Sequence, residues 1–508
     1  MTETDTSLPH TLPNMAFLPP STATRRLCVC ISDIHCTDCT VGNQTGESGD
    51  WAHLFDEILG AAVGAQELVL VLNGDIVDLI RSGRWTEAGV YPWQRDHPDF
   101  PAVLLSIMRG IVRWHATEDG PGGRPGFFYQ LRQFKQTLAE REPGIDIRVV
   151  PIVGNHDKEL LVDNAARQLF YEACLDWPHG MPDAAYTQWV DAMYGPKVRA
   201  TPAWMPFYYG DTGFALFATH GQWRDPMNCR DIAGWRCRQG WQPARWQADA
   251  FAPFTEPCFG DTIAAGLLSG FIWDAKEKLR ERARHRLVAE RHVDQDALNR
   301  IAAILDEMDL YRPALKGILR IMEEAKRQRK TDVDRDIIRI VTDTFRDQLV
   351  RWLKRDATRI FASARMCWAL RLLSALVKVW NEATILLVLK VIAYFQEPER
   401  SIDPSTLLTL PGFSEAYRSH GFRLHVEGHT HVALEADLGF ERPAAAASYT
   451  YVNLGAWRSQ IYPKANNPQR YRRRGIARAL FIASERLEGD RMEVRYWVLD
   501  LTRWGGAS

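Results

Sequence analysis

The sequence predicts an α/β protein with two sheets, flanking helices and a large α-helical insertion. Three observations indicate this fold class. Short apolar runs recur near both ends of the chain, a helical segment separates the first two runs, and residues 271–395 change to long, charge-rich helical periodicity. Apolar runs of about four to eight residues are typical of buried strands, whereas longer segments with a 3.6-residue period are typical of helices.

The first three expected strands are residues 27–31, 68–72 and 148–153, each followed by a polar or glycine-containing turn. A helix is expected at 51–63, and the resulting β-α-β alternation predicts a sheet with parallel strands. Five further strands are expected at residues 214–218, 423–426, 449–454, 477–483 and 492–499.

The length of 508 residues exceeds what one hydrophobic core usually organises, so we expect either two domains or one core that carries a large insertion. Residues 1–24 are rich in Thr, Ser and Pro, lack the pattern of a secretory signal and are expected to form a flexible tail. The core is expected at 25–224 and again at 421–508. Residues 225–420 are expected to form a mainly helical insertion or lid.

Residues 366–396 of this insertion predict one amphipathic helix. Arg371, Lys378 and Glu382 fall on a narrow stripe, which leaves a broad apolar face. Each charge would cost about 2.5–3.5 kcal/mol at the centre of a bilayer, so a membrane-spanning helix is disfavoured. Packing on other helices is the favoured interpretation, and peripheral membrane or lipid contact through the insertion is the alternative.

The overall charge and the cysteines limit the function classes. A net charge of -1 gives no strong long-range attraction to nucleic acid or to an anionic membrane. Nine cysteines without the spacing of a disulfide framework favour a reducing cytoplasm, with a location at the membrane surface as the alternative. Cys36 and Cys39 are interpreted as ordinary thiols in preference to a metal or redox pair.

Five clusters of metal-ligand residue types follow predicted strands. They are Asp33-Ile34-His35, Gly74-Asp75-Ile76-Val77-Asp78, Gly154-Asn155-His156-Asp157, Thr219-His220-Gly221 and Gly428-His429-Thr430-His431. One such cluster alone is more often a surface turn, but the carboxyl ends of strands in an α/β sheet meet at one edge. Five clusters in this arrangement therefore predict a binuclear metal site.

The spacing within the clusters predicts how the ligands are shared. In an Asp-x-His segment both side chains point to the same side, so Asp33 and His35 can bind one cation. Two cations require a bridging carboxylate, and Asp75 is the expected bridge because Gly74 permits a tight turn. Asp78 is expected to support Asp75 from behind.

The ordered motifs D-x-H, G-D-x-x-D, G-N-H-D, T-H-G and G-H-T-H resemble the calcineurin-like metallophosphoesterase family. The resemblance covers residues 27–221 and 421–500, includes Asn453-Leu454-Gly455 after the last motif, and implies a two-sheet sandwich flanked by helices. It also implies that one metal is held by Asp33, His35, Asp75 and His431, and a second by Asp75, Asn155, His220 and His429.

The same resemblance implies a catalytic role for His156, which Asp157 would orient unless it caps the following turn. The implied cofactors are two divalent ions, with manganese, iron or zinc expected because the ligands are oxygen and nitrogen donors without cysteine. Two such ions would activate a hydroxide for attack on a phosphodiester, pyrophosphate or phosphomonoester, and His156 would protonate the leaving oxygen.

The substrate is expected to be lipid-linked or a nucleotide. The position of the insertion resembles that in bacterial UDP-diacylglucosamine pyrophosphohydrolases, although this chain is longer and has His156 where they typically have arginine. One alternative is a metal-dependent nuclease that uses the aromatic and basic segment 223–246, although packing is favoured for its tryptophans. A second basic run, at 470–474, suits a solvated loop and a phosphate site equally. The other alternative is a non-catalytic binding scaffold.

Overall fold

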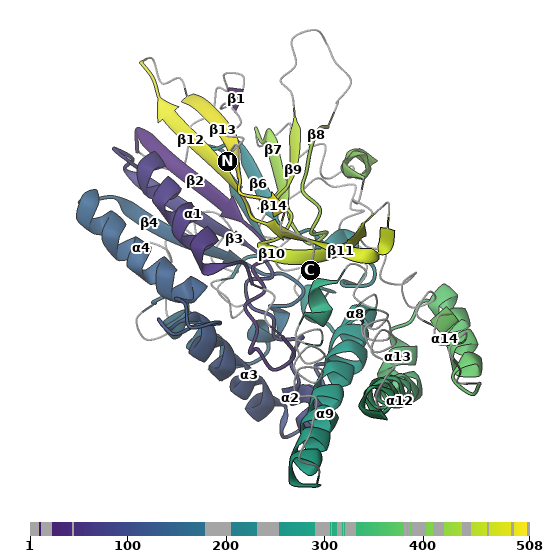
Figure 1. The fold of residues 1–508 in the computed structure, drawn as a ribbon. Coiled ribbons are helices and arrows are strands. Elements are labelled where there is room, and N and C mark those ends of the chain that lie inside the picture. Colours follow the sequence, from purple (N-terminus) through teal and green to yellow (C-terminus); the bar gives the residue numbers. More distant parts are fainter. Residues whose placement is uncertain are drawn as a thin grey trace.

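The computed structural model is an α/β protein with two mixed sheets, as the sequence predicts at that level (Figure 1). The structure describes residues 10–11, 23–42, 45–177, 205–230, 253–289, 332–379, 403–409, 421–438, 449–464, 467–488 and 492–504, with single residues between 305–320 and 381–388.

The first sheet has the strand order β1-β13-β12-β2-β3-β4, in which β2, β3 and β4 are parallel. Its strands are β1 (His10–Thr11), β2 (Arg25–Ile31), β3 (Glu67–Asn73), β4 (Asp146–Ile152), β12 (Arg478–Arg486) and β13 (Met492–Asp500). Every residue of β3 is buried, as its apolar sequence predicts.

Helices α1, α3 and α4 flank this sheet (Figure 1). The helices of this part are α1 (Ser48–Ala61), α2 (Arg84–Ala88), α3 (Phe100–His115), α4 (Phe127–Arg141) and α5 (Asn164–Ala173). Aromatic contacts join α1 to α4, because Phe55 stacks on Phe134 and Trp51 packs edge-on against Phe127. Such pairs add to the stabilisation that comes from burying apolar area.

The second sheet has the order β5-β6-β7-β9-β8, with β6, β7 and β9 parallel. Its strands are β5 (Tyr208–Asp211), β6 (Leu216–Thr219), β7 (Leu424–Glu427), β8 (Leu434–Asp437) and β9 (Thr450–Asn453). The pairing of β6 with β7 joins residues that lie on opposite sides of the long insertion in the sequence. The chain therefore leaves this sheet after β6 and returns to the neighbouring position.

A buried ion-pair network connects the two sheets. Arg26 on β2 donates to Glu67 on β3 and to Asp211 on β5, with nitrogen–oxygen distances of 2.8 Å in both pairs. Burial opposes the charge on Arg26, but the two carboxylates raise its pKa above the usual value. Asp211 shows the opposite shift, because Arg26 outweighs burial and lowers the pKa of the Asp211 carboxyl.

A small third sheet was not expected from the sequence. It consists of β10 (Arg458–Lys464), β11 (Asn467–Ile476) and β14 (Arg503–Trp504). The 470–474 basic run lies in β11 and not in a loop, and Arg473 pairs with Glu307 at 3.0 Å. Mixed polar and basic residues hide the two-residue period that would have indicated these strands.

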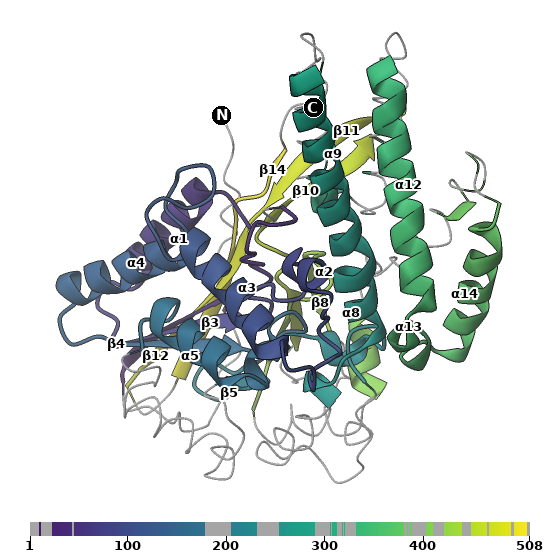
Figure 2. The same cartoon turned by 90° about the horizontal axis from the view of Figure 1, so that it is seen from below.

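The expected insertion contains several helices. They are α8 (Phe259–Asp261), a π-helix at Thr262–Ser269, α9 (Gly270–Ala289), α12 (Asp332–Lys354), α13 (Asp356–Ile360) and α14 (Ala364–Leu376). Short 3-10 helices lie at Lys158–Leu161, Gln222–Arg224, Met308–Leu310 and Pro404–Thr409. Figure 2 shows α9 and α12 side by side, with α14 on the outer edge. Phe271, Phe345 and Trp352 belong to a hydrophobic cluster separate from that of the sheets.

The expectation of one continuous helix over 366–396 is wrong, because α14 ends at Leu376 and a turn follows. The cause is local. Asn381 and Thr384 exchange hydrogen bonds between each side chain and the other's backbone amide, at 3.0 and 2.8 Å, a pattern that favours a new helix start. No helix within the described residues is long and apolar enough to cross a membrane.

Candidate metal centre

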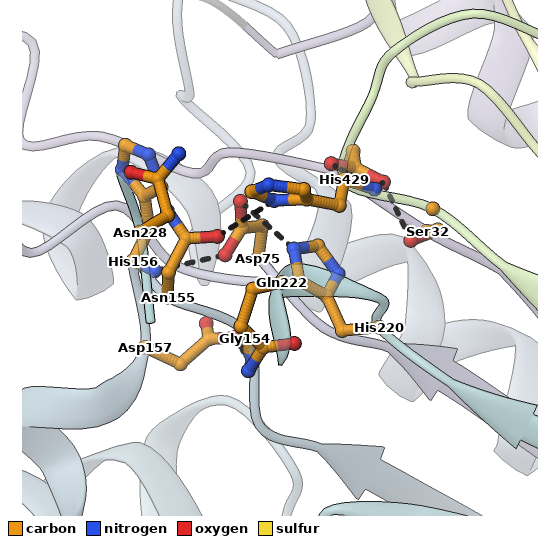
Figure 3. Close-up of polar contacts among 12 residues, drawn as sticks. Ser32, Asp75, Gly154, Asn155, His156, Asp157, His220, Gln222, Asn228 and His429 are labelled. Carbon is orange, nitrogen blue, oxygen red and sulfur yellow. Dashed lines mark hydrogen bonds and ion pairs between the residues drawn. The ribbon is translucent and has the colours of Figure 1, made fainter. Parts of the chain in front are cut away.

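The loops after β2, β3, β4, β6 and β7 bring all the predicted ligand residues to one place. Asp75 lies at the centre of the group, with Asn155, His156, His220 and His429 around it (Figure 3). The parallel pairing in both sheets explains this convergence, since the carboxyl ends of neighbouring parallel strands share an edge.

Five of the predicted ligands have a left-handed backbone. They are Asp33 (φ 55°), His35 (φ 51°), Asp75 (φ 50°), His429 (φ 65°) and His431 (φ 59°). A residue other than glycine in this region costs about 1–3 kcal/mol and persists only where its surroundings enforce it. Here the backbone of Asp33 donates to Gly74 O at 3.0 Å, and that of His35 donates to Asp75 O at 2.9 Å. The strained conformations cluster at the side chains that could bind a cation.

Two glycines permit the close approach of these loops. Gly74 has φ 86°, and a Cβ at this position would overlap the ring of His220. A Cβ at Gly428 would overlap the side chains of Ser32 and Asp33. Both positions therefore require glycine, for steric reasons that the sequence motifs alone do not reveal.

The first ligand group consists of Asp33, His35, Asp75 and His431, whose donor atoms all lie within 4.8 Å of one another. The Nε2 atoms of His35 and His431 face each other at 3.1 Å, and His431 Nε2 lies 3.0 Å from Asp33 Oδ1. Asp33, His35 and Asp75 are buried. Two imidazoles and two carboxylates that converge in this way could hold a metal ion.

The second group consists of Asp75, His220 and His429, with donor atoms again within 4.8 Å of one another. Asn155 adds an amide oxygen that lies 2.9 Å from His429 Nδ1. Asp75 belongs to both groups, which is the position expected of a bridging carboxylate. Its Oδ1 also accepts from the backbone of His156 at 2.8 Å, so the carboxylate is fixed in orientation.

The environment of His220 suits a histidine that binds a metal ion better than a histidine that only packs in the core. Its Nδ1 lies 2.9 Å from Asn73 O, and this contact leaves Nε2 as the atom that faces Asp75 Oδ2 at 3.3 Å. Nε2 is fully buried and has no aligned hydrogen-bond partner. Burial alone would lower the pKa of His220, but Asp75 and Asp33 raise it to about 10. The site thus favours positive charge here, which a cation can supply in place of the proton.

Asp78 has a different role from the one expected. It was expected to support Asp75, but its carboxylate lies between two imidazoles, with Oδ2 3.2 Å from His35 Nδ1 and Oδ1 2.7 Å from His156 Nδ1. It therefore holds His35 with Nε2 directed at the first ligand group. Although burial opposes the shift, Asp78 and Asp75 raise the pKa of His156 to about 9, which favours its protonated form.

The expectation that Asp157 orients His156 is not supported by the geometry. The Asp157 carboxylate accepts from the backbone amides of Val77 at 2.8 Å and Gly154 at 2.9 Å. It therefore ties two candidate ligand loops together, and its side chain makes no cap hydrogen bond to the following helix Lys158–Leu161, so the alternative role is not supported either. Burial, followed by the charge of Asp75, raises the pKa of Asp157 to about 7. Its position is structural, behind the ligands.

Asp225 is a site residue that the sequence did not indicate. Its Oδ2 lies 3.0 Å from His429 Nε2 and also accepts from the Asn228 side chain at 2.7 Å. This contact fixes the ring of His429 with Nδ1 toward Asn155. A lone Asp in a segment without periodicity gave no signal, although its place five residues after His220 is a turn that could return to the site.

The insertion is attached to the core close to these residues. Lys158, three positions after Asn155, forms a buried ion pair with Asp261 of α8 at 2.6 Å. Arg81, three positions after Asp78, donates from Nε to Ser269 Oγ at 3.1 Å. Both contacts join residues next to the candidate centre to the insertion, at α8 and at the end of the π-helix that follows it.

Two other sequence hypotheses concern neighbouring residues. Arg224, from the segment 223–246, is buried against Glu427 and Tyr451, and Arg230 pairs with Glu256 at 2.8 Å. Trp223 is buried, as the packing interpretation predicts, and the tryptophans and arginines of that segment after Arg230 lie outside the described residues. Cys36 is a buried free thiol, and no cysteine belongs to the ligand groups found among the described residues.

Comparisons with protein-family models, curated proteins and solved structures found no match to this chain. Its chemistry is therefore inferred from the arrangement of its own residues.

Proposed function

We propose that this chain is a binuclear metal-dependent phosphoesterase of the calcineurin-like metallophosphoesterase type, with the two-sheet sandwich of that family. One observation supports the proposal above the others. Asp75 is shared by two ligand groups, and His156, the nearby imidazole favoured in its protonated form, belongs to neither of them, although it forms a third possible group with His35 and Asp78. Two cation sites beside a proton donor are what hydrolysis of a phosphate ester requires.

The proposed ligands would be divided between the two metal ions as the family resemblance implies. One divalent ion would be held by Asp33, His35, Asp75 and His431, and the other by Asp75, Asn155, His220 and His429. When bound, the two ions would neutralise phosphate oxygens and lower the pKa of water. Manganese, iron and zinc all suit these oxygen and nitrogen donors.

His156 would act on the leaving group. Asp78 occupies its Nδ1, so Nε2 remains to donate a proton to the oxygen that departs from phosphorus. Proton donation of this kind contributes roughly 100- to 10,000-fold in rate. The side chain of His156 is 18% exposed and that of the proposed ligand His431 is 19% exposed, so a substrate can reach both.

The substrate is proposed to be a phosphodiester or pyrophosphate, lipid-linked or nucleotide, with phosphomonoesters as further candidates. The nuclease alternative is weaker, because Arg224 and Arg230 already pair with carboxylates of the chain.

Purified chain, stripped of metal and reloaded separately with Mn²⁺, Fe²⁺ or Zn²⁺, would test the proposal. Hydrolysis would be measured on bis-(p-nitrophenyl) phosphate, p-nitrophenyl phosphate, a nucleotide pyrophosphate and single-stranded DNA. We expect metal-dependent turnover of a diester or pyrophosphate that falls at least 100-fold in His156→Ala.

Metal binding without turnover of any of these substrates would support the scaffold alternative, and cleavage of DNA alone would support the nuclease. Failure to bind any of the three metals would contradict the proposed centre itself. His53→Ala, an exposed histidine on α1, is the matched control and should retain full activity.

A further inference from the structure

Exposed large hydrophobic side chains are concentrated in one part of the insertion. The described residues include eight of them, and five lie between residues 360 and 387. Ile360 is 70% exposed, Trp368 69%, Leu372 37% and Val379 60%. Single exposed apolar residues need no explanation, but a cluster of this kind marks a surface that binds something apolar.

Helix α14 is apolar on two opposite faces. Leu370, Leu373 and Val377 are buried in the hydrophobic cluster of the insertion. At about 100° per residue, Trp368 and Leu372 lie within about 40° of each other and on the other side of the helix from these leucines. Figure 2 shows this helix at the outer edge of the molecule, with α12 on its inner side. The exposed face is therefore not needed to hold the insertion together.

Basic residues border the exposed face. Arg371 and Lys378 are exposed, and Arg359 is exposed at the end of α13. From residue 357 to 381 the sequence contains four basic residues and no Asp or Glu, although the whole chain has a net charge of -1. A helix that combines tryptophan and leucine with flanking arginine and lysine suits the boundary of an anionic bilayer, where apolar groups enter the acyl region and cations contact phosphate.

We propose that the exposed face of α14 and of the turn after it, formed by Trp368, Leu372 and Val379 and bordered by Arg371 and Lys378, binds the surface of anionic lipid membranes. The excess of four basic residues over acidic residues in this segment selects lipid over a second copy of the chain, because two such faces would repel each other. The proposal does not depend on phosphoesterase activity, since none of these residues belongs to the metal centre.

The full-length chain would be sedimented with vesicles of phosphatidylcholine alone and of equal parts phosphatidylglycerol and phosphatidylcholine. We expect the chain to bind the anionic vesicles. This binding should weaken as the salt concentration rises, because salt screens the attraction between the basic side chains and the lipid phosphates. The pair Trp368→Gln with Leu372→Gln should lower the partition coefficient roughly tenfold or more. The pair Arg371→Gln with Lys378→Gln should lower it roughly 10- to 30-fold on anionic vesicles.

The matched control is Val63→Gln with Leu487→Gln, which removes two exposed hydrophobic residues elsewhere and should leave binding unchanged. Circular dichroism and melting temperature would establish that each variant is folded. The proposal would be overturned by a wild-type chain that does not bind anionic vesicles, or by control variants that lose as much binding as the α14 variants. A dimer that Trp368→Gln dissociates, without lipid binding, would also overturn it and assign the face to a second copy.

Discussion

The Nδ1 atom of His156 lies 2.7 Å from Oδ1 of Asp78, whereas the carboxylate of the adjacent Asp157 is turned to backbone amides. The same Asp78 carboxylate contacts His35 through its other oxygen. One buried side chain therefore positions both the proposed proton donor and a proposed metal ligand.

Asp78→Asn is expected to reduce kcat on a diester by roughly 100-fold or more, because the variant no longer favours protonated His156. The alkaline limb of the pH profile should move to lower pH, since loss of the neighbouring negative charge lowers the pKa of His156. Asp157→Asn should mainly lower thermal stability. A larger loss of kcat in a folded Asp157→Asn variant would reverse the two roles.

The metal content of two variants should distinguish the role of Asp75 from that of His156. Asp75→Asn is expected to lose both ions, because Asp75 is the member common to the two ligand groups. His156→Ala should retain both and lose turnover. Elemental analysis after dialysis against a weak chelator would measure the content of each variant. Metal-free His156→Ala protein would show that His156 is a ligand.

Asp225→Asn is expected to weaken metal binding by roughly 10- to 100-fold, as loss of a carboxylate that orients a metal-binding histidine usually does. The binding would be followed by titration of the stripped chain with Zn²⁺ against a competing chelator. Asn228→Ala, which removes the neighbouring hydrogen bond to the same carboxylate, should have a smaller effect. Unchanged affinity in Asp225→Asn would show that His429 needs no such support.

His115 should make the chain less stable in mild acid. Burial lowers the pKa of His115 to about 4, even though its contact with Thr37 O opposes the shift. In the unfolded chain the pKa is about 6.5, so protonation favours unfolding as the pH falls from about 6.5 to about 4. The free energy of unfolding is expected to fall by roughly 3 kcal/mol in all over this pH range. Urea unfolding at pH 7.5 and pH 5 should show a smaller difference for His115→Gln than for the wild type.

The matched control for that measurement is His53→Gln, which removes an exposed histidine from α1. It should lose stability between the two pH values to the same extent as the wild type. An equal pH dependence in His115→Gln would mean that His115 is not held in its neutral form.

The sequence predicted the strands that precede the candidate ligands, because short apolar runs indicate buried strands. It also predicted the sharing of Asp75, because each motif follows such a run. The roles of Asp78 and Asp225 depend on contacts with residues up to 204 positions away, which no local pattern contains. The break after Leu376 was missed because apolar periodicity continues through the Asn381–Thr384 bonds that start a new turn.

The ligands of the proposed first metal are separated by almost the whole chain, from Asp33 to His431. A nascent polypeptide cannot complete this site until the ribosome has made β7 and the two histidines after it, which at about 5–20 residues per second takes roughly 20 to 90 s. Loading of the proposed first metal site would therefore be a late event, and a product that ends before residue 429 would lack His429 and His431, two of the proposed ligands.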